Sequence, residues 1–127
     1  MNEQRRYPRI EKSLSLKLSD SEFDVVTETK NISGNGVYCA IDKPLEPMTK
    51  LNIIILIPLR KNKNKTIKKI HCEGVVVRKE YVRNNAKFAY HVGIYFNEIK
   101  EYDRKLLLSY INAHLKALEL TAPTLNS

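Results

Sequence analysis

The sequence predicts a mainly all-β protein, a six- to seven-stranded antiparallel barrel followed by one C-terminal α-helix. Short apolar runs with strand-like alternation, separated by turn-forming residues, fill the chain up to about Asn97. After that residue the apolar period changes from two to three or four, as in an amphipathic helix. Strands followed by a single helix indicate an antiparallel sheet with the helix packed on it.

Length and composition fit one globular domain. The chain has 127 residues, 43% of them hydrophobic, and no apolar run of about 18 residues that could cross a membrane. Its first residues lack the apolar segment of a secretion signal. We therefore expect a cytoplasmic protein without a membrane span, in which Cys39 and Cys72 are reduced thiols of the core.

The first three strands are predicted from alternation and β-branched residues. Residues 13–18 alternate strictly, with three leucines on one face. Residues 23–29 are rich in valine and threonine, and residues 37–41 form the next strand-like run. Between them, residues 31–36 hold two glycines, two asparagines and a serine, so we expect a turn over this stretch.

Prolines and a glycine divide the next part of the chain. Residues 42–48 contain two prolines, which cannot donate to a ladder, and predict a loop. Residues 51–57 are the most apolar run and predict a strand covered on both faces, ended by the proline that follows. Residues 67–79 predict a long strand or a strand with a bend at its glycine, and residues 88–96 alternate as a further strand.

The helix is predicted over residues 100–119, where apolar side chains recur three to four apart. Residues 1–12 predict a flexible basic arm, and residues 120–127 a disordered tail. The barrel would occupy about residues 13–96. Arm, barrel and helix then make a single domain over residues 5–119.

Positive charge gathers in one segment. The net charge is +8, and residues 60–69 hold six basic residues and no acid. Such runs are usually solvated loops, and we expect a loop here. The other interpretation is attraction of an anionic ligand, membrane or nucleic acid. Nucleic acid is the weaker choice because the segment has no Tyr, Phe or His to stack on bases.

The residue pattern does not indicate an enzyme or a metal protein. His71 and Cys72 are adjacent, so on a strand they would point to opposite faces, and His91 and His114 belong to no metal-binding spacing. Nothing pairs a nucleophile with a base. The glycines of residues 34–36 are not followed by the Lys and Ser or Thr of a phosphate-binding loop. We expect no catalytic residue, no metal and no cofactor.

Two short motifs give the chain a family resemblance. They are Arg5-x-x-x-Arg9 and, further along, Asn31-x-Ser33-x-x-Gly36. In this order and strand context they resemble the PilZ domain, the bacterial receptor module for cyclic di-GMP. The sequences Glu-Gly-Val-Val-Val-Arg at 73–78 and Val-Gly-Ile-Tyr-Phe at 92–96 also fall where that family has them. The resemblance covers roughly residues 5–118.

The resemblance implies a ligand site. It assigns the phosphates and guanine edges to Arg5 and Arg9, whose guanidinium forks suit both. Asn31 and Ser33 would reach the polar edge of a guanine, and Gly36 would let base and backbone come close. Asn35 departs from a glycine common in the family, and asparagine tolerates left-handed geometry well. Secondary candidates are Gln4, Arg6, Arg78 and Gly93.

In functional terms, the resemblance implies a cyclic di-GMP receptor or adaptor of bacterial second-messenger signalling. The arm would close over one ligand or a stacked pair and create a surface that a downstream protein reads. One alternative is a PilZ-like protein that does not bind the nucleotide and contacts only other proteins. The other is a small basic barrel that binds nucleic acid.

Overall fold

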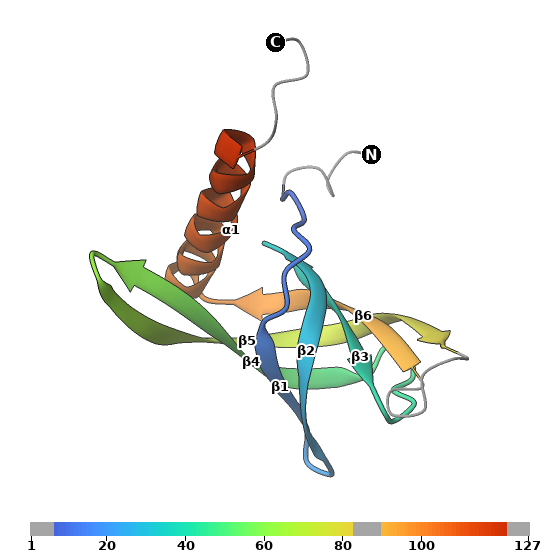
Figure 1. The fold of residues 1–127 in the computed structure, drawn as a ribbon. Helices are drawn as coiled ribbons and strands as arrows, with labels where there is room; N and C mark the ends of the chain where they lie inside the picture. The colour runs from blue at the N-terminus through green and yellow to red at the C-terminus, as the bar shows by residue number, and fades with distance from the viewer. Residues whose placement is uncertain (1–6, 83–89, 122–127) are drawn as a thin grey trace.

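The fold is an antiparallel barrel with one helix (Figure 1). The computed structural model describes residues 7–82 and 90–121. Its strands are β1 (Ser15–Ser19), β2 (Asp24–Ser33), β3 (Gly36–Ile41), β4 (Lys50–Lys61), β5 (Asn64–Tyr81) and β6 (Tyr90–Ile99), and its helix is α1 (Glu101–Thr121). The predicted mainly β fold with a C-terminal helix is confirmed, with six strands in the described residues.

Closure of the barrel follows from the pairing of β1 with β4. The strand order is β1-β2-β3-β6-β5-β4, and every neighbouring pair is antiparallel. Alternate residues fill the interior, as Leu16 and Leu18 of β1 do opposite Ile55 and Ile53 of β4. A closed sheet has no exposed edge where its strands are all paired.

The helix α1 packs on the barrel through one apolar stripe. Leu107 and Ile111 are fully buried, and their spacing of four residues is one helical turn. Acidic Glu101 and Asp103 lie in the first turn, where the helix dipole favours them. In Figure 1 the C-terminal half of α1 points away from the strands. Among the described residues, no helix is long and apolar enough to span a membrane.

The turn predicted over residues 31–36 is shorter than expected. β2 continues to Ser33, which pairs with Gly36, so only Gly34 and Asn35 form the turn. Neither has a positive φ. Asn35 therefore does not need to adopt left-handed geometry, because this turn is built with ordinary negative φ angles.

The predicted loop in the basic segment is wrong, because strands occupy most of residues 58–66; residues 67–69 lie in a strand as predicted. β4 runs through Pro58 to Lys61, β5 begins at Asn64, and only the two residues between them form the turn. Pro58 does not end the strand because β1 pairs with β4 only as far as Ile55; beyond it, β4 can turn its missing N–H to a free edge. β4 is not covered on both faces either, since Ile54 is only half-buried.

Two further features of the core agree with the sequence. The long strand is confirmed, since β5 runs without a break from Asn64 to Tyr81. A Cβ at Gly74 would lie 2.6 Å from side chains of Ile53 and Ile94, so packing requires glycine there. Cys39 and Cys72 are free and buried, and burial raises the pKa of each thiol to about 12. They are the reduced core thiols that the sequence predicts.

Candidate ligand-binding site

The floor of the candidate site is a row of four residues that crosses four neighbouring strands. Asn31 of β2 pairs with Tyr38 of β3, Tyr38 pairs with Gly93 of β6, and Gly93 pairs with Arg78 of β5. Residues paired directly across a sheet lie on the same face. The row therefore brings together three of the predicted site residues, Asn31, Gly93 and Arg78, and adds Tyr38.

Two β-bulges turn the ends of this row outward. The register shifts between Thr29 and Asn31 in β2, and between Val76 and Arg78 in β5. Thr29 and Val76 are buried, so strict alternation would direct Asn31 and Arg78 into the barrel as well. One extra residue in each strand reverses the inward–outward alternation, so Asn31 and Arg78 lie on the outer face of the barrel. Bulges commonly re-aim a side chain in this way beside a functional site.

Arg9 is held at the row by Asn31. Its Nη1 donates to Asn31 Oδ1 at 2.7 Å. The neighbouring Ile10 is 3% exposed, and its backbone exchanges hydrogen bonds of 2.9 and 3.0 Å with Ile32 of β2. Ile10 therefore attaches the predicted arm to the barrel next to Arg9. Three predicted site residues lie outside the described residues: Gln4, Arg5 and Arg6.

Ser33 closes the turn between β2 and β3. Its Oγ donates to Asn35 Oδ1 at 2.7 Å and accepts from the Asn35 backbone N–H at 3.3 Å. The residue is only 1% exposed. In this structure the hydroxyl thus holds the turn, and a ligand would reach it only after the Asn35 side chain turned away.

Tyr38 supplies an aromatic face that the sequence analysis did not select. The guanidinium carbon of Arg78 lies 4.9 Å from the Tyr38 ring centroid, within cation–π range. The Tyr38 hydroxyl donates to Glu80, which also lies 3.9 Å from Arg78 Nε. Desolvation, followed by Glu80, raises the pKa of Tyr38. The available signal was the alternation of residues 37–41, which places Tyr38 opposite the buried side chains.

Gly36 and Gly93 both border the site, but for different reasons. A Cβ at Gly36 would lie 2.7 Å from the backbone oxygen of Ile94, so the close approach of β3 to β6 requires glycine there. A Cβ at Gly93 would meet Arg78 Cβ at 3.5 Å and Tyr38 Cδ1 at 3.8 Å, which are ordinary contacts. The bare backbone of Gly93 instead leaves the floor open between those two side chains.

A groove of about 630 Å³ lies over Tyr38, Gly93 and Arg78, between the arm and the outer faces of β3, β5 and β6. Asn31 and Ser33 are not among the residues that line it, so Arg9 connects the groove to Asn31. Arg9 and Arg78 line it from two sides, and Tyr38 and Tyr95 contribute aromatic rings. The volume is typical of a small-molecule site. Guanidinium groups and rings in one groove suit a ligand that combines flat bases with phosphates.

A second groove, of about 710 Å³, lies on the outer face of β1 and β2. Its lining carries Glu11 and Glu28 beside Lys12 and Lys30, and it has no aromatic residue. Two carboxylates would repel an anionic ligand, and no ring is present for a base. We therefore place the candidate site in the smaller groove.

Tyr7 connects the arm to α1 beside the groove. A Cβ at Gly34 would lie 2.6 Å from both Tyr7 Cδ1 and Leu108 Cδ2, so the missing side chain lets arm and helix meet on the turn. Arg104 Nη1 donates to the Tyr7 hydroxyl at 3.2 Å. Arg104 Nε is buried and has no partner among the described residues. Arm, turn and helix thus share one set of contacts.

The histidines and cysteines named above as metal-ligand candidates do not converge on one point. His71 is exposed and Cys72 is buried, so they face opposite sides of β5 as predicted. His91 packs edge-on against Tyr38, with ring centroids 5.4 Å apart. Within residues 7–82 and 90–121 no group of three or more His, Cys, Asp or Glu side chains could hold a metal ion.

Known proteins share this fold. The family model of the PilZ domain matches residues 3–113. The Bacillus subtilis inhibitor of motility, MotI/DgrA, superposes with a TM-score of 0.75 at 24% sequence identity, over 88% of this chain and 52% of that one. The PilZ domain of YcgR from Escherichia coli, solved with c-di-GMP, gives a TM-score of 0.58 at 14% identity, over 92% and 96%.

A third structure is MrkH, a c-di-GMP-dependent transcription regulatory factor, with a TM-score of 0.59 at 18% identity. The superposition covers 93% of this chain and 52% of MrkH. The chain therefore spans about half the length of MotI and of MrkH, and nearly all of the YcgR domain. No curated protein matches the sequence. At these identities the likeness is one of fold.

Proposed function

The chain belongs to the PilZ domain family, and we propose that it is a receptor for cyclic di-GMP. The observation that carries this proposal is the 2.7 Å hydrogen bond from Arg9 to Asn31. It joins the two sequence motifs at the edge of a groove, and the guanidinium group of Arg78 lines the same groove. PilZ domains are receptor and adaptor modules, so the proposed activity is binding rather than catalysis.

Each proposed contact follows from the chemistry of a cyclic dinucleotide. Arg9 and Arg5 would bind phosphate oxygens or the O6 and N7 of guanine, with Arg6 adding charge. Asn31 would offer its amide to a guanine edge once Arg9 turns to the ligand, and Ser33 would do so after releasing Asn35. Arg78 and Tyr38 would stack on a base above Gly93.

The proposed switch uses the attachment of the arm at Ile10. Residues ahead of it, including Gln4 and Arg5, would close over the bound ligand and leave the barrel fixed. Tyr7 would then shift relative to Arg104, and the changed surface would be read by a downstream protein. Because the two free thiols fit a reducing compartment, we include a cytoplasmic location in the proposal.

A second candidate is a PilZ-like adaptor that does not bind the nucleotide. One observation favours it. The Oδ1 of Asn31 already accepts from Arg9, and the hydroxyl of Ser33 already donates to Asn35, so each motif side chain already has a hydrogen-bond partner within the protein. Binding would have to replace these hydrogen bonds with better ones, such as charge-assisted contacts to phosphate.

Calorimetric titration with cyclic di-GMP at about 0.15 M salt separates the two candidates. The receptor should give saturable heat of micromolar affinity or tighter, and GTP should not. Arg9→Ala and Arg5→Ala should each weaken this binding roughly ten- to a hundredfold, whereas the matched control Lys65→Ala, far from the groove, should keep it. The stoichiometry distinguishes one ligand from a stacked pair. No heat from folded protein would overturn the receptor and favour the adaptor.

A further inference from the structure

The β4–β5 hairpin projects from the barrel as a ribbon of two strands, from Leu56 through the turn to His71 (Figure 1). β1 stops pairing with β4 at Ile55, and β6 begins pairing with β5 at Cys72. The ladder between β4 and β5 nevertheless continues without a register shift to Lys61 and Asn64. β4 and β5 therefore stay paired as a regular two-stranded ribbon beyond the point where β1 and β6 flank them.

The ribbon carries most of the excess positive charge of the chain. Six basic residues and no acid lie between residues 60 and 69, against a net charge of +8 for the whole chain. The described side chains of this group are all exposed: Arg60, Lys63, Lys65, Lys68 and Lys69. Among the ion pairs of residues 7–82 and 90–121, none includes them.

One pairing in the ribbon opposes folding. Arg60 lies directly across the ladder from Lys65. Like charges at directly paired positions destabilise a sheet. An anionic surface placed over both side chains would remove this repulsion, so the pair indicates an external partner of negative charge.

The same face of the ribbon also carries apolar side chains. Paired residues share a face, so the pairs Arg60 with Lys65, Pro58 with Ile67 and Leu56 with Lys69 alternate with pairs on the other face. Ile67 is 66% exposed. Its side chain borders a shallow groove of about 200 Å³ with Leu56 and Pro58. Cations and exposed apolar groups thus stand on one outer face.

We propose that this outer face binds a bilayer surface of anionic lipids. Arg60, Lys65 and Lys69 would lie at the headgroup phosphates, and Ile67 and Pro58 would enter the interfacial layer between them. Nucleic acid would satisfy the cations, but it would gain nothing from an exposed isoleucine between them. The ribbon also lacks Tyr, Phe and Trp for stacking on bases.

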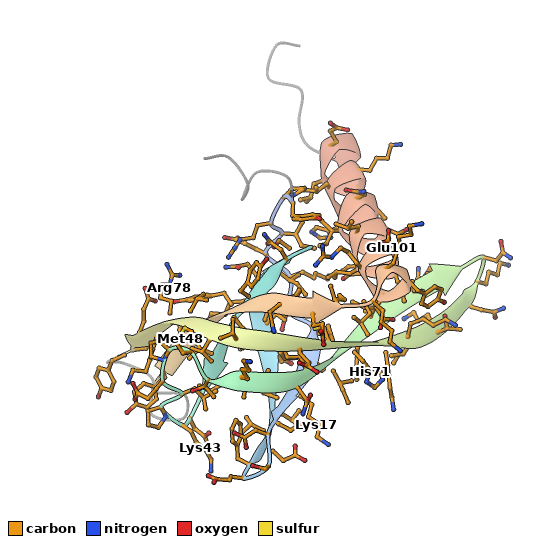
Figure 2. The ribbon with its side chains drawn as sticks, turned by 180° about the vertical axis from the view of Figure 1, so that it is seen from behind. Lys17, Lys43, Met48, His71, Arg78 and Glu101 are labelled. Carbon is orange, nitrogen blue, oxygen red and sulfur yellow. The ribbon has the colours of Figure 1, made fainter. Side chains whose placement is uncertain are left out.

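The proposed surface and the nucleotide groove can be occupied together. Arg78 and Lys65 lie toward opposite ends of β5, roughly 40 Å apart along an extended strand. Figure 2 shows Arg78 at the end of the barrel away from the ribbon, with His71 near the ribbon base. The proposal therefore does not depend on cyclic di-GMP, and each activity can fail alone.

Vesicle flotation of the full chain tests the proposal. The probes are vesicles of phosphatidylglycerol and phosphatidylcholine in equal parts, and vesicles of phosphatidylcholine alone, at about 0.15 M and about 0.5 M salt. The first variant is the triple change Arg60→Gln, Lys65→Gln, Lys69→Gln. Its matched control removes the same number of exposed cations elsewhere, with Lys30→Gln, Lys43→Gln and Lys105→Gln.

We expect binding to the anionic vesicles alone, weakened by salt. The ribbon triple variant should lose at least about tenfold in affinity and its control about twofold or less. Ile67→Ser should lose about threefold at both salt concentrations, because its contribution is apolar. Equal loss in both triple variants, no effect of Ile67→Ser, or tighter binding to a DNA duplex than to vesicles would each overturn the proposal. Arg9→Ala should float normally, and the ribbon variant should keep its nucleotide binding.

Discussion

Both ends of β5 carry positive charge, but only at one end do neighbouring side chains fix the cations in place. At the groove end Arg78 lies against Tyr38 and Glu80, and Arg9 is hydrogen-bonded to Asn31. At the ribbon end Lys65 faces another cation across the ladder and is exposed. Cations fixed by neighbours can recognise one geometry, whereas unpaired cations on a ribbon add up to a field that attracts anionic surfaces in general.

The two ends of β5 should differ most in their contribution to nucleotide affinity. Arg9→Ala should weaken cyclic di-GMP binding by about 1.5 to 3 kcal/mol, roughly ten- to a hundredfold, because a charge-assisted contact set is lost. Lys65→Ala should leave the equilibrium constant unchanged at about 0.15 M salt. Calorimetry on both variants measures the difference. If Lys65→Ala lost the ligand and Arg9→Ala did not, the comparison between the two ends would be reversed.

Two glycine variants distinguish a packing role from a ligand-binding role at the groove end. Gly36→Ala should destabilise the fold by about 2 kcal/mol, because its Cβ would press on the backbone oxygen of Ile94. Gly93→Ala has room and should change stability by less than about 0.5 kcal/mol. It should still weaken nucleotide binding, since the methyl group enters the groove floor.

Urea unfolding and calorimetry on the same two proteins check both statements. Equal losses of stability would show that Gly93 is as constrained by packing as Gly36. A Gly93→Ala protein that binds cyclic di-GMP normally would remove Gly93 from the site.

At the ribbon end of β5, a substitution in the turn should have a smaller effect on folding stability. Asn62 has a φ of 61°, a left-handed conformation that asparagine and glycine tolerate. Asn62→Ala should cost about 1 kcal/mol of folding stability, and Asn62→Gly should cost less. Thermal unfolding measures both. Asn62→Ala should leave nucleotide affinity unchanged, because the ribbon turn lies far from the groove.

The smallest effect concerns pH. Burial, followed by Lys30, lowers the pKa of His91, while Glu80 acts in the opposite direction. The unfolded chain therefore binds this proton more readily, so folding stability falls as pH drops from about 6.5 through the lowered pKa. His91→Gln should flatten this dependence in urea titrations between about pH 5 and about pH 8. If His71→Gln at the ribbon end flattened it instead, the sensitivity would not belong to the groove.

Unbroken patterns of the sequence predicted the structure well. The leucine alternation of β1 and the three-to-four spacing that buries Leu107 and Ile111 both gave the correct element. The two bulges are what strand alternation could not predict. No residue type marks an inserted residue, so alternation alone could not place Asn31 and Arg78 on the outer face, although the family resemblance named both.

The outer part of the ribbon, residues 58–66, was not predicted as strand for a different reason. Its lysines and Pro58 are typical of a loop, and the usual sign of a strand, a buried alternating face, is weak where only one sheet layer is present. The contact between Arg9 and Asn31 could not be predicted either. It depends on Ile10 pairing with Ile32, a long-range bridge that no local pattern encodes.

The free edges of the ribbon bear on how this protein behaves in concentrated solution. Past Ile55 on one side and before Cys72 on the other, no strand within residues 7–82 and 90–121 pairs with the ladder as a third. Such edges can recruit a strand from another molecule and seed aggregation. Pro58 removes one donor, and repulsion between lysines keeps copies apart. Variants that neutralise the ribbon therefore also weaken its protection against self-association, and their solubility becomes an independent readout of those charges.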